Sequence, residues 1–541
     1  MMLGILSVLS SAFALEDDYT LSLEGYYRMR SYSYRNLYID QEEPGKFVSQ
    51  RLRIQPQINY KDKAKFFFMT DIMDDVVWGD NQSLASTALF AEDPSFTGEN
   101  GQQSASFQLK RAWMEVDLAV GSLRVGRQPS HWGMGLLANS GDGFDDAFGE
   151  NHSGANFDRI LFATKPIAVA QTIMGKAVSD IPLYFGYAFD RLVEDPLNQY
   201  YGYTCDNGPT GVIYEGEEGF DPVCDVNGDG KIDSTEVHGY TETREDDVRA
   251  DQLDWTFDND DDVNEHVFLT IYRGQNIDLA GSKADLTVGL YGINRNQAET
   301  DSKVWIVDGY VYLLWKNLYL ESEVLNIKGE SRAVPLLSDS ETDPLYKDVN
   351  IWGYAAKAGY KTKDFYALFE TGYAGGDNDV TDDYFTARAI HRDYNVGLLI
   401  YDEILRVTTY RGWQGSAAAL RSNGGVYNSR YIFPVVRTSF MGNWEALVGY
   451  LKVWPDKPDG AIIQCSEADK EKGIECATYE ATANEIGWEV DAAIKARLYN
   501  HVLFSVEGAY AQVTDRIKLD SVGLNTEGSF FTVQTRFAYE F

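Results

Sequence analysis

Residues with oxygen ligands recur at fixed spacing in the acidic segment 225–236. It reads Asp-Val-Asn-Gly-Asp-Gly-Lys-Ile-Asp-Ser-Thr-Glu, with a glycine at position six and a glutamate at position twelve. This is the pattern of a calcium-binding loop, in which position seven gives its backbone carbonyl and the last glutamate binds with both oxygens. An acidic loop that matches by chance is the alternative. The pattern predicts a structural Ca²⁺ site with the ligands Asp225, Asn227, Asp229, Lys231, Asp233 and Glu236.

The four cysteines fall into two local pairs, both within long polar segments. In an exported protein, local pairs of this kind form disulfides. We therefore expect Cys205 to bond to Cys224, just before the predicted calcium loop, and Cys465 to bond to Cys476. Zinc is the alternative, but the spacings do not suit a zinc site.

Arginine is the second residue type whose placement suggests chemistry. If Leu21 and Leu23 lie on one face of a strand, Arg28 and Arg30 lie on the other. Guanidinium groups inside a water-filled lumen attract anions and bind carboxylates or phosphates in a forked geometry. The predicted lumen-lining set is Arg28, Arg30, Arg51, Arg53, Arg111, Arg124 and Arg536. The alternative is an internal ion-pair network that stiffens the wall without selecting a solute, with Glu24, Glu115, Asp117, Glu321, Glu323, Glu489 and Asp491 as partners.

Strands must position these residues, because polar and apolar side chains alternate along the chain. In residues 50–60, Leu52 and Ile54 alternate with Arg51 and Arg53, as expected of a strand whose faces meet different surroundings. No stretch after residue 15 reaches the roughly 18 apolar residues of a transmembrane helix. In lipid, strands can span only as a closed barrel, because open backbone groups would stay unpaired. A soluble all-β protein is the alternative.

The connections between the expected strands are alternately short and long. Short turns are expected at 61–63, 120–121, 316–317, 361–363, 442–443 and 500–501, and long polar loops near 77–105, 130–155, 191–262, 331–349, 375–390 and 455–482. This asymmetry is typical of outer-membrane barrels, with short periplasmic turns and long extracellular loops. Counting strands gives 20, including a pair at 392–401 and 404–412. The prediction is an all-β transmembrane antiparallel barrel of 18–20 strands, in which 191–262 is a long acidic extracellular loop.

The two ends of the chain indicate export. Residues 1–14 are apolar, and Ala12-Phe13-Ala14 fits a cleavage site, so we expect 1–14 to be the remnant of a signal peptide and 15–541 to be the barrel. The last strand resembles that of Gram-negative outer-membrane proteins, which is read by the barrel assembly machinery. That resemblance makes Phe537, Tyr539 and Phe541 the expected assembly signal and the outer membrane of a Gram-negative bacterium the expected location.

Charge and histidine placement argue against two other classes of function. The formal net charge of −36 argues against nucleic acid as a partner, since binding it needs a basic surface. The cluster His131, His152, Asp142, Asp145 and Asp146 lies in one expected loop, but nothing in the sequence places a serine or a water nucleophile beside it. We therefore do not expect an enzyme.

Several short motifs resemble those of alginate-export-type outer-membrane porins. They are Leu-Arg-Val-Gly-Arg-Gln at 123–128, Trp-Gly-Met-Gly at 132–135, Asp308 with Tyr310 and Tyr312, Leu-Glu-Ser-Glu at 320–323, and Gly-Tyr-Ala-Gly-Gly-Asp-Asn at 372–378. The resemblance implies a monomeric barrel of about 18 strands that passes anionic polysaccharide or small solutes. It also implies that Arg28, Arg30, Arg51, Arg53 and Arg111 bind acidic sugars. The predicted calcium loop is not part of that family's pattern.

Taken together, these features predict a porin-like channel in outer-membrane lipid for the diffusion of small polar solutes, anionic ones among them. Two alternatives remain. One is a barrel that exports an acidic polysaccharide, and the other is a surface adhesion or scaffold barrel whose calcium-braced loop binds a partner.

Overall fold

The computed structural model describes residues 18–37, 45–61, 63–78, 107–144, 146–151, 154–192, 202–203, 212–214, 231–233, 240–241, 263–297, 302–331, 347–378, 383–412, 421–457, 483–517, 519 and 524–541. The predicted signal remnant at 1–14 lies outside these residues.

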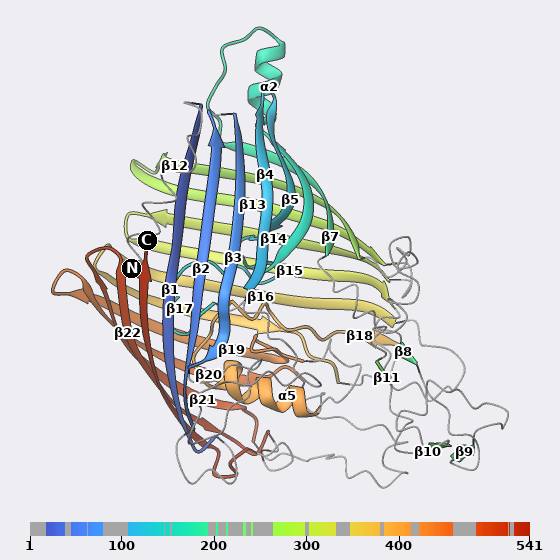
Figure 1. Ribbon diagram of the computed structural model, residues 1–541, viewed down its shortest axis with the longest axis vertical. Helices are drawn as coiled ribbons and strands as arrows, with labels where there is room; N and C mark the ends of the chain where they lie inside the picture. The colour runs from blue at the N-terminus through green and yellow to red at the C-terminus, as the bar shows by residue number, and fades with distance from the viewer. Residues whose placement is uncertain are drawn as a thin grey trace, which may run out of the picture.

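One antiparallel sheet closes on itself to form a barrel (Figure 1). In the described part of the chain the sheet has 19 strands, of which the two-residue β18 (Tyr384–Phe385) pairs parallel with β16 and the other 18 form the wall. Each wall strand pairs with its neighbour in chain order, and the last strand pairs with the first. The wall strands are β1 (Tyr19–Arg35), β2 (Gly45–Tyr60), β3 (Ala64–Val77), β4 (Phe107–Leu118), β5 (Gly121–Pro129), β6 (Asn156–Thr164), β7 (Leu183–Leu192), β12 (Asn264–Leu279), β13 (Ser282–Gln297), β14 (Ser302–Trp315), β15 (Leu318–Ser331), β16 (Lys347–Lys361), β17 (Phe365–Ala374), β19 (Ser429–Phe440), β20 (Trp444–Pro455), β21 (Gly487–Leu498), β22 (Val502–Val513) and β23 (Ser529–Glu540).

The predicted barrel class is confirmed, but the pair of strands predicted within 392–412 is wrong. Residues 400–412 instead form the π-helix η1 (Ile400–Leu405) and the helix α5 (Arg406–Gly412). The consecutive residues 398–400 are all buried. A segment that is surrounded by protein on all sides needs no alternation, so its apolar residues imitate those of a strand. The wall therefore has 18 strands, the lower end of the predicted range.

The two rims of the barrel differ, as the spacing predicts. At the rim that carries both ends of the wall, most connections have two or three residues, such as 316–317 between β14 and β15. The turn Ala280–Gly281 has φ of 47° and 74°, the left-handed pair that a two-residue hairpin turn requires. The exception is the β6–β7 connection, where the helix α2 (Pro166–Ile173) projects beyond the strand ends (Figure 1). We call this end the short-turn rim.

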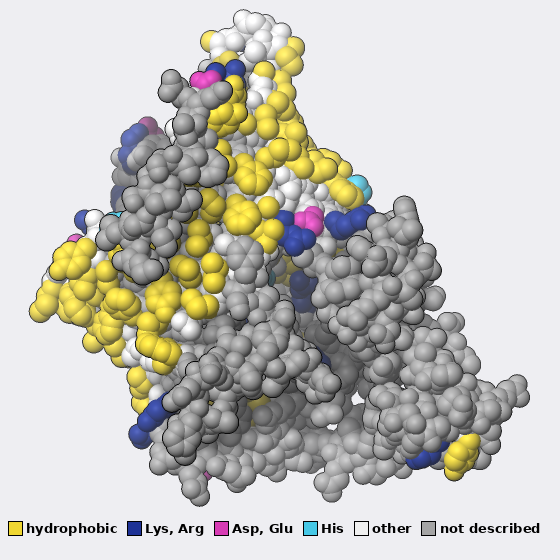
Figure 2. Space-filling model, viewed as in Figure 1, with side chains coloured by type: hydrophobic (Ala, Val, Ile, Leu, Met, Phe, Trp, Pro, Cys, Tyr) yellow, Lys and Arg dark blue, Asp and Glu magenta, His cyan; other side chains and the backbone are white. Residues whose placement is uncertain are grey.

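The outer face of the wall is apolar. Large hydrophobic side chains with about half of their surface exposed include Leu21, Met114, Ile160, Leu290 and Val448, which come from strands around the whole wall. Figure 2 shows hydrophobic side chains spread over the strands on the face in view. An apolar band of this kind is what lipid requires. Phe537, Tyr539 and Phe541 of the terminal segment are exposed on the same outer face. Among the described helices, none is long and apolar enough to cross a membrane.

Among the described residues, parts of two connections lie inside the barrel and form a hydrophobic core there. The β5–β6 loop (130–155) contributes Leu136 and Phe148 to that core, and the β17–β19 loop (375–428) contributes Leu398 and Ile404. Each of these side chains is buried. The lumen is therefore occupied by loops, and the functional site lies between those loops and the charged inner wall.

Candidate functional site

The register of the first and last strands gathers the predicted arginines on the inner wall. Arg28 of β1 lies opposite Arg51 of β2, and Arg30 of β1 lies opposite Arg536 of β23. Side chains that are directly opposite in an antiparallel pair share one face of the sheet. Arg28, Arg30, Arg51, Arg53, Arg111 and Arg536 each keep 5% or less of their surface exposed. Buried guanidiniums so close together need nearby carboxylates.

Glu150 of the β5–β6 loop supplies the central counter-charge. Its carboxylate forms ion pairs with Arg28 at 2.7 Å and Arg30 at 2.8 Å, and lies 3.7 Å from Arg536. Burial alone would raise the pKa of Glu150, but the charges of these three arginines outweigh it and hold the pKa well below its usual range. One loop carboxylate thus neutralises guanidiniums from both the first and the last strand.

A second anchor of the same loop engages the next strands. Asp142 pairs with Arg111 at 2.9 Å and with Arg53 at 3.5 Å. Arg53 also forms a forked pair with Asp71, at 2.7 and 2.8 Å. Arg51 pairs with Asp74. The Asp142 pairs fix the loop against β2 and β4, and the pairs of Asp71 and Asp74 join β2 to β3.

Arg124 differs from the other six predicted arginines. It lies opposite Glu115, with which it pairs at 2.6 Å, and Lys65 contacts the same carboxylate at 3.2 Å. The Arg124 side chain keeps 44% of its surface exposed. It lies near the short-turn rim, where water screens its charge.

Sequence reasoning placed these arginines on one face but named few of their partners. Of the carboxylates proposed for an ion-pair network, Glu115 does pair with an arginine of the set. The main partners were missed, and they are Asp71, Asp74, Asp142, Glu150 and Glu507. The alternation in β3 could have indicated Asp71, which has the same parity as Lys65. No sequence signal gives the path of the loop that carries Asp142 and Glu150.

Two wall glutamates, one on β15 and one on β21, each hold one lumen loop in the same way. Glu323 of β15 accepts hydrogen bonds from the backbone N–H groups of the three consecutive residues 134–136. Glu489 of β21 accepts them from residues 398–400, at 2.6–2.9 Å. Because three consecutive backbone N–H groups donate to each of these carboxyl groups, each loop backbone is held firmly to the wall.

The two lumen loops also bind one another. The His391 N–H donates to the Leu136 carbonyl at 2.8 Å, and the Asn139 side chain donates to the Asp393 carbonyl at 3.0 Å. The Gly154 N–H donates to the Asp393 carboxylate at 2.8 Å. The loops therefore form one constriction inside the barrel.

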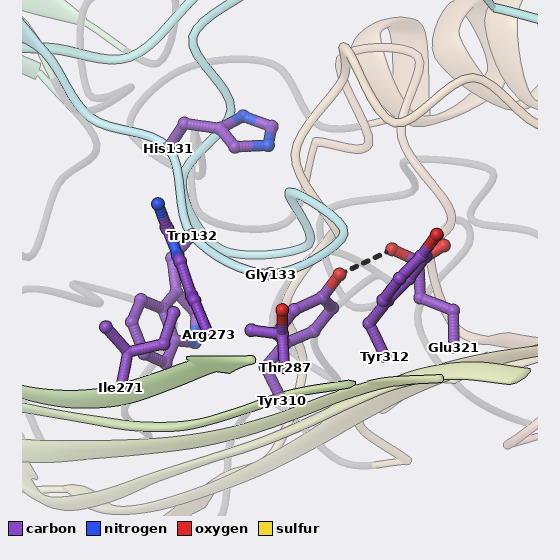
Figure 3. Close-up of a pocket in the computed structure, with 9 residues that line it drawn as sticks. All are labelled: His131, Trp132, Gly133, Ile271, Arg273, Thr287, Tyr310, Tyr312 and Glu321. Atoms are coloured by element: carbon purple, nitrogen blue, oxygen red, sulfur yellow. Dashed lines mark hydrogen bonds between the residues drawn. The ribbon is translucent and has the colours of Figure 1, made fainter. Parts of the chain in front are cut away.

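A pocket of about 310 Å³ lies between this constriction and the short-turn rim (Figure 3). His131 and Trp132 of the β5–β6 loop cover it on one side, and the strands β12 to β15 provide the wall. Figure 3 shows Arg273 and Glu321 on opposite sides of the space, with Tyr310 between them. The Trp132 indole N–H donates to Asp308 at 3.1 Å, and its ring stacks on Tyr291. These contacts hold Trp132 in place over the pocket.

The histidine cluster named in the sequence is divided between different partners. Burial lowers the pKa of His131, whose Nδ1 accepts a hydrogen bond from the Ser140 N–H at 3.2 Å. Asp142 instead pairs with arginines. His152 and Asp145 lie outside the described residues.

The predicted calcium loop lies largely outside the described residues, as do all four cysteines. Two of its predicted ligands, Lys231 and Asp233, belong to β10 (Lys231–Asp233), which pairs with β9 (Val212–Tyr214). A second short pair joins β8 (Gly202–Tyr203) to β11 (Tyr240–Thr241).

Comparison with known proteins gives only distant structural likeness. No family model matches the chain, and no curated protein matches it. Solved structures similar to it include three from Pseudomonas aeruginosa. OpdQ has a TM-score of 0.46 at 10% identity, covering 97% of this chain and 98% of that one. OccK5 (OpdH) has 0.44 at 10%, covering 96% and 98%, and OpdK with vanillate has 0.43 at 9%, covering 96% and 98%. The barrel assignment itself rests on the strand pairing described above.

Proposed function

We propose that this protein is a porin-like channel in the outer membrane of a Gram-negative bacterium and that it passes small polar solutes, anionic ones among them. One observation carries the proposal. The closed wall is apolar outside, while its inner face carries buried, ion-paired arginines beside a polar pocket. A soluble barrel would expose this apolar outer face to water, and a barrel with a purely structural role would not require the pocket.

Anions are the favoured charge class because guanidiniums dominate one side of the lumen. Arg28, Arg30 and Arg536 share the carboxylates of Glu150 and Glu507. A carboxylate solute can replace a protein carboxylate in such a forked contact. Since most of the arginines are already paired, the preference for anions is modest.

The constriction favours small molecules over a polymer. The β5–β6 loop is held to the wall by buried ion pairs and by Glu323, the β17–β19 loop is held by Glu489, and the two loops bind each other. Passage of an extended polysaccharide would require these anchors to separate. The likeness of the 123–135 motifs to alginate-export-type porins supports an anionic solute. The constriction is the reason to prefer a small anion to an anionic polymer.

We also propose roles for the last strand, for the loop 191–262 and for the cysteine pairs. The C-terminal Phe537, Tyr539 and Phe541 serve as the signal for the barrel assembly machinery. The loop 191–262 binds a structural Ca²⁺, supported by the match of 225–236 to the loop pattern. The pairs Cys205–Cys224 and Cys465–Cys476 form disulfides after export.

Single-channel conductance in a planar bilayer tests the proposed function. Under a salt gradient we expect stable open steps and a reversal potential on the anion side. Silence of the purified, folded barrel at all voltages, with and without calcium, would contradict the channel and leave a surface-binding barrel as the better explanation.

A further inference from the structure

The outer face of the wall changes from apolar to polar toward the end opposite the short turns, which we call the long-loop rim. On β15, the exposed side chains of Leu318 and Val324 are followed on the same face by the exposed Lys328. The run 318–328 matches the roughly 9–11 residues with which a tilted strand crosses the hydrocarbon of a membrane. Lys328 therefore lies where the hydrocarbon ends and the lipid headgroups begin.

Strand pairing continues this polar boundary over the neighbouring strands. Lys303 of β14 is two residues from Trp305, whose side chain is exposed, so both lie on the outer face. Asn296 lies opposite Lys303, and Asn264 lies opposite Asn296. Arg191 lies opposite Asn264. This row on the outer face thus has a cation at each end and amides between them.

A second row lies one step nearer to the apolar band. His266 lies opposite Asn294, and Asn294 lies opposite Trp305, which in turn lies opposite Lys328. Neither row contains a carboxylate, although the whole chain has a formal net charge of −36. Figure 2 shows lysine, arginine and histidine side chains, with acidic ones beside them, where the hydrophobic area ends. We name the hydrogen-bond donors of the two rows the donor surface: Arg191, Asn264, His266, Asn294, Asn296, Lys303 and Lys328.

The two lysines of the donor surface carry charge that the described carboxylates do not neutralise. Lys303 and Lys328 are exposed, and within the described part of the chain neither forms an ion pair, although Glu330 lies opposite Lys303. In contrast, Arg127 on β5 pairs with Asp158 at 2.8 Å at the same level of the wall. Cations that remain unneutralised beside the hydrocarbon attract anionic headgroups.

The spacing of the cations suits a headgroup with two anionic groups. Lys328 is two residues from Glu330, which lies opposite Lys303, so the lysines are diagonal neighbours about 7–8 Å apart. Their flexible four-carbon stems let both ammonium groups approach one phosphate. Arg191 is three strands away from Lys303, roughly 14 Å along the row. Its guanidinium can contact a second phosphate in a forked geometry.

We propose that the donor surface binds a glycolipid of the outer leaflet whose headgroup carries two phosphates. One phosphate lies on Lys303 and Lys328, the other lies on Arg191, and the amides between them contact the sugars. The acyl chains lie on the apolar band, with which the donor surface is continuous. Long loops mark the extracellular end of a barrel, so the headgroup belongs to the outer leaflet. This inference goes beyond the proposed function and depends on the barrel spanning a membrane, not on conduction.

Native mass spectrometry of the full-length barrel in detergent, titrated with lipid, tests this assignment. The probes are lipid A with two phosphates, its monophosphoryl form and its fully dephosphorylated form, all with the same acyl chains. We expect lipid A to bind at least about tenfold more tightly than the dephosphorylated form, since one charged hydrogen bond contributes that much. Lys303→Gln with Lys328→Gln should remove most of this preference. Arg191→Gln should lower the affinity for lipid A to that for the monophosphoryl form.

Two further double variants separate phosphate recognition from general effects of charge and folding. Lys283→Gln with Lys316→Gln removes two exposed lysines at the short-turn rim and should leave the affinity for lipid A unchanged. Lys303→Arg with Lys328→Arg keeps both charges at the long-loop rim and should keep the preference for phosphorylated lipid.

Three outcomes would overturn the inference. The first is equal affinity for lipid A and its dephosphorylated form. The second is an unchanged affinity in the folded variant that lacks both Lys303 and Lys328. The third is displacement of lipid A by excess inorganic phosphate, which would identify a site for the free anion. None of these results changes the conductance expected of the channel, so the two proposals can fail separately.

Discussion

Replacing Glu150 by Gln should destabilise the barrel and change its ion selectivity at the same time. The carboxylate pairs with Arg28 at 2.7 Å and with Arg30 at 2.8 Å, and all three groups are buried. Arg30 keeps Glu507 at 4.0 Å after the change, whereas Arg28 keeps only the Ser49 hydroxyl at 2.8 Å among the contacts described. Removing one partner of a buried ion pair costs about 3–5 kcal/mol. We expect a loss of about 3 kcal/mol, since the remaining partners offset part of the cost.

Urea unfolding in lipid vesicles would measure the stability, and the reversal potential under a salt gradient would measure the selectivity. The variant adds one unbalanced positive charge to the constriction, so the reversal potential should move toward the anion limit. Asp278→Asn is the matched control, because the pair Asp278–Lys283, which is exposed beside the short turn between β12 and β13, should contribute only about 0–1 kcal/mol. If Glu150→Gln unfolds at the same urea concentration as the control, with an unchanged reversal potential, the loop does not neutralise the arginines.

Three other predictions follow from the loops. Burial raises the pKa of Asp146 to about 6, above its value of about 3.9 in the unfolded chain. The folded protein should therefore lose stability as the pH rises from about 4 through about 6. Asp146→Asn should remove this pH dependence, which unfolding midpoints measured across that range would show. Glu323→Gln and Glu489→Gln should each weaken one loop anchor by about 1–3 kcal/mol and increase current noise in single-channel records; quiet traces in both would refute the anchoring role. Asp225→Ala with Glu236→Ala should abolish millimolar calcium binding measured by calorimetry, and binding that persists would place the ion elsewhere.

The wall could be predicted from the sequence because strands obey a local rule. Alternation with period two places Arg28 and Arg30 inward and Leu21 outward without any knowledge of neighbours. The same rule failed at 392–412, where a loop buried within the barrel carries apolar residues without alternation. Alternation predicts a strand only where its two faces meet different surroundings, and this segment is surrounded by protein on all sides.

The site could be predicted only in part. The inward direction of the arginines follows from strand parity, but their neutralisation by Asp142 and Glu150 depends on where the β5–β6 loop runs. That path is fixed by contacts between residues far apart in the sequence, such as the Trp132 indole with Asp308. Arg273 went unnoticed for a similar reason, because nothing in its own segment shows that it lines a pocket formed by four strands and the β5–β6 loop.

The contact of Glu150 with both β1 and β23 has a consequence for how the barrel forms. Arg28 and Arg30 belong to the first strand and Arg536 to the last, so this loop carboxylate spans the seam where the sheet closes. Before the β5–β6 loop enters the lumen, Glu507 of β22 is the only one of these carboxylates present to offset the arginines that closure brings together. We therefore expect the first and last strands to join most favourably once this loop lies inside the barrel.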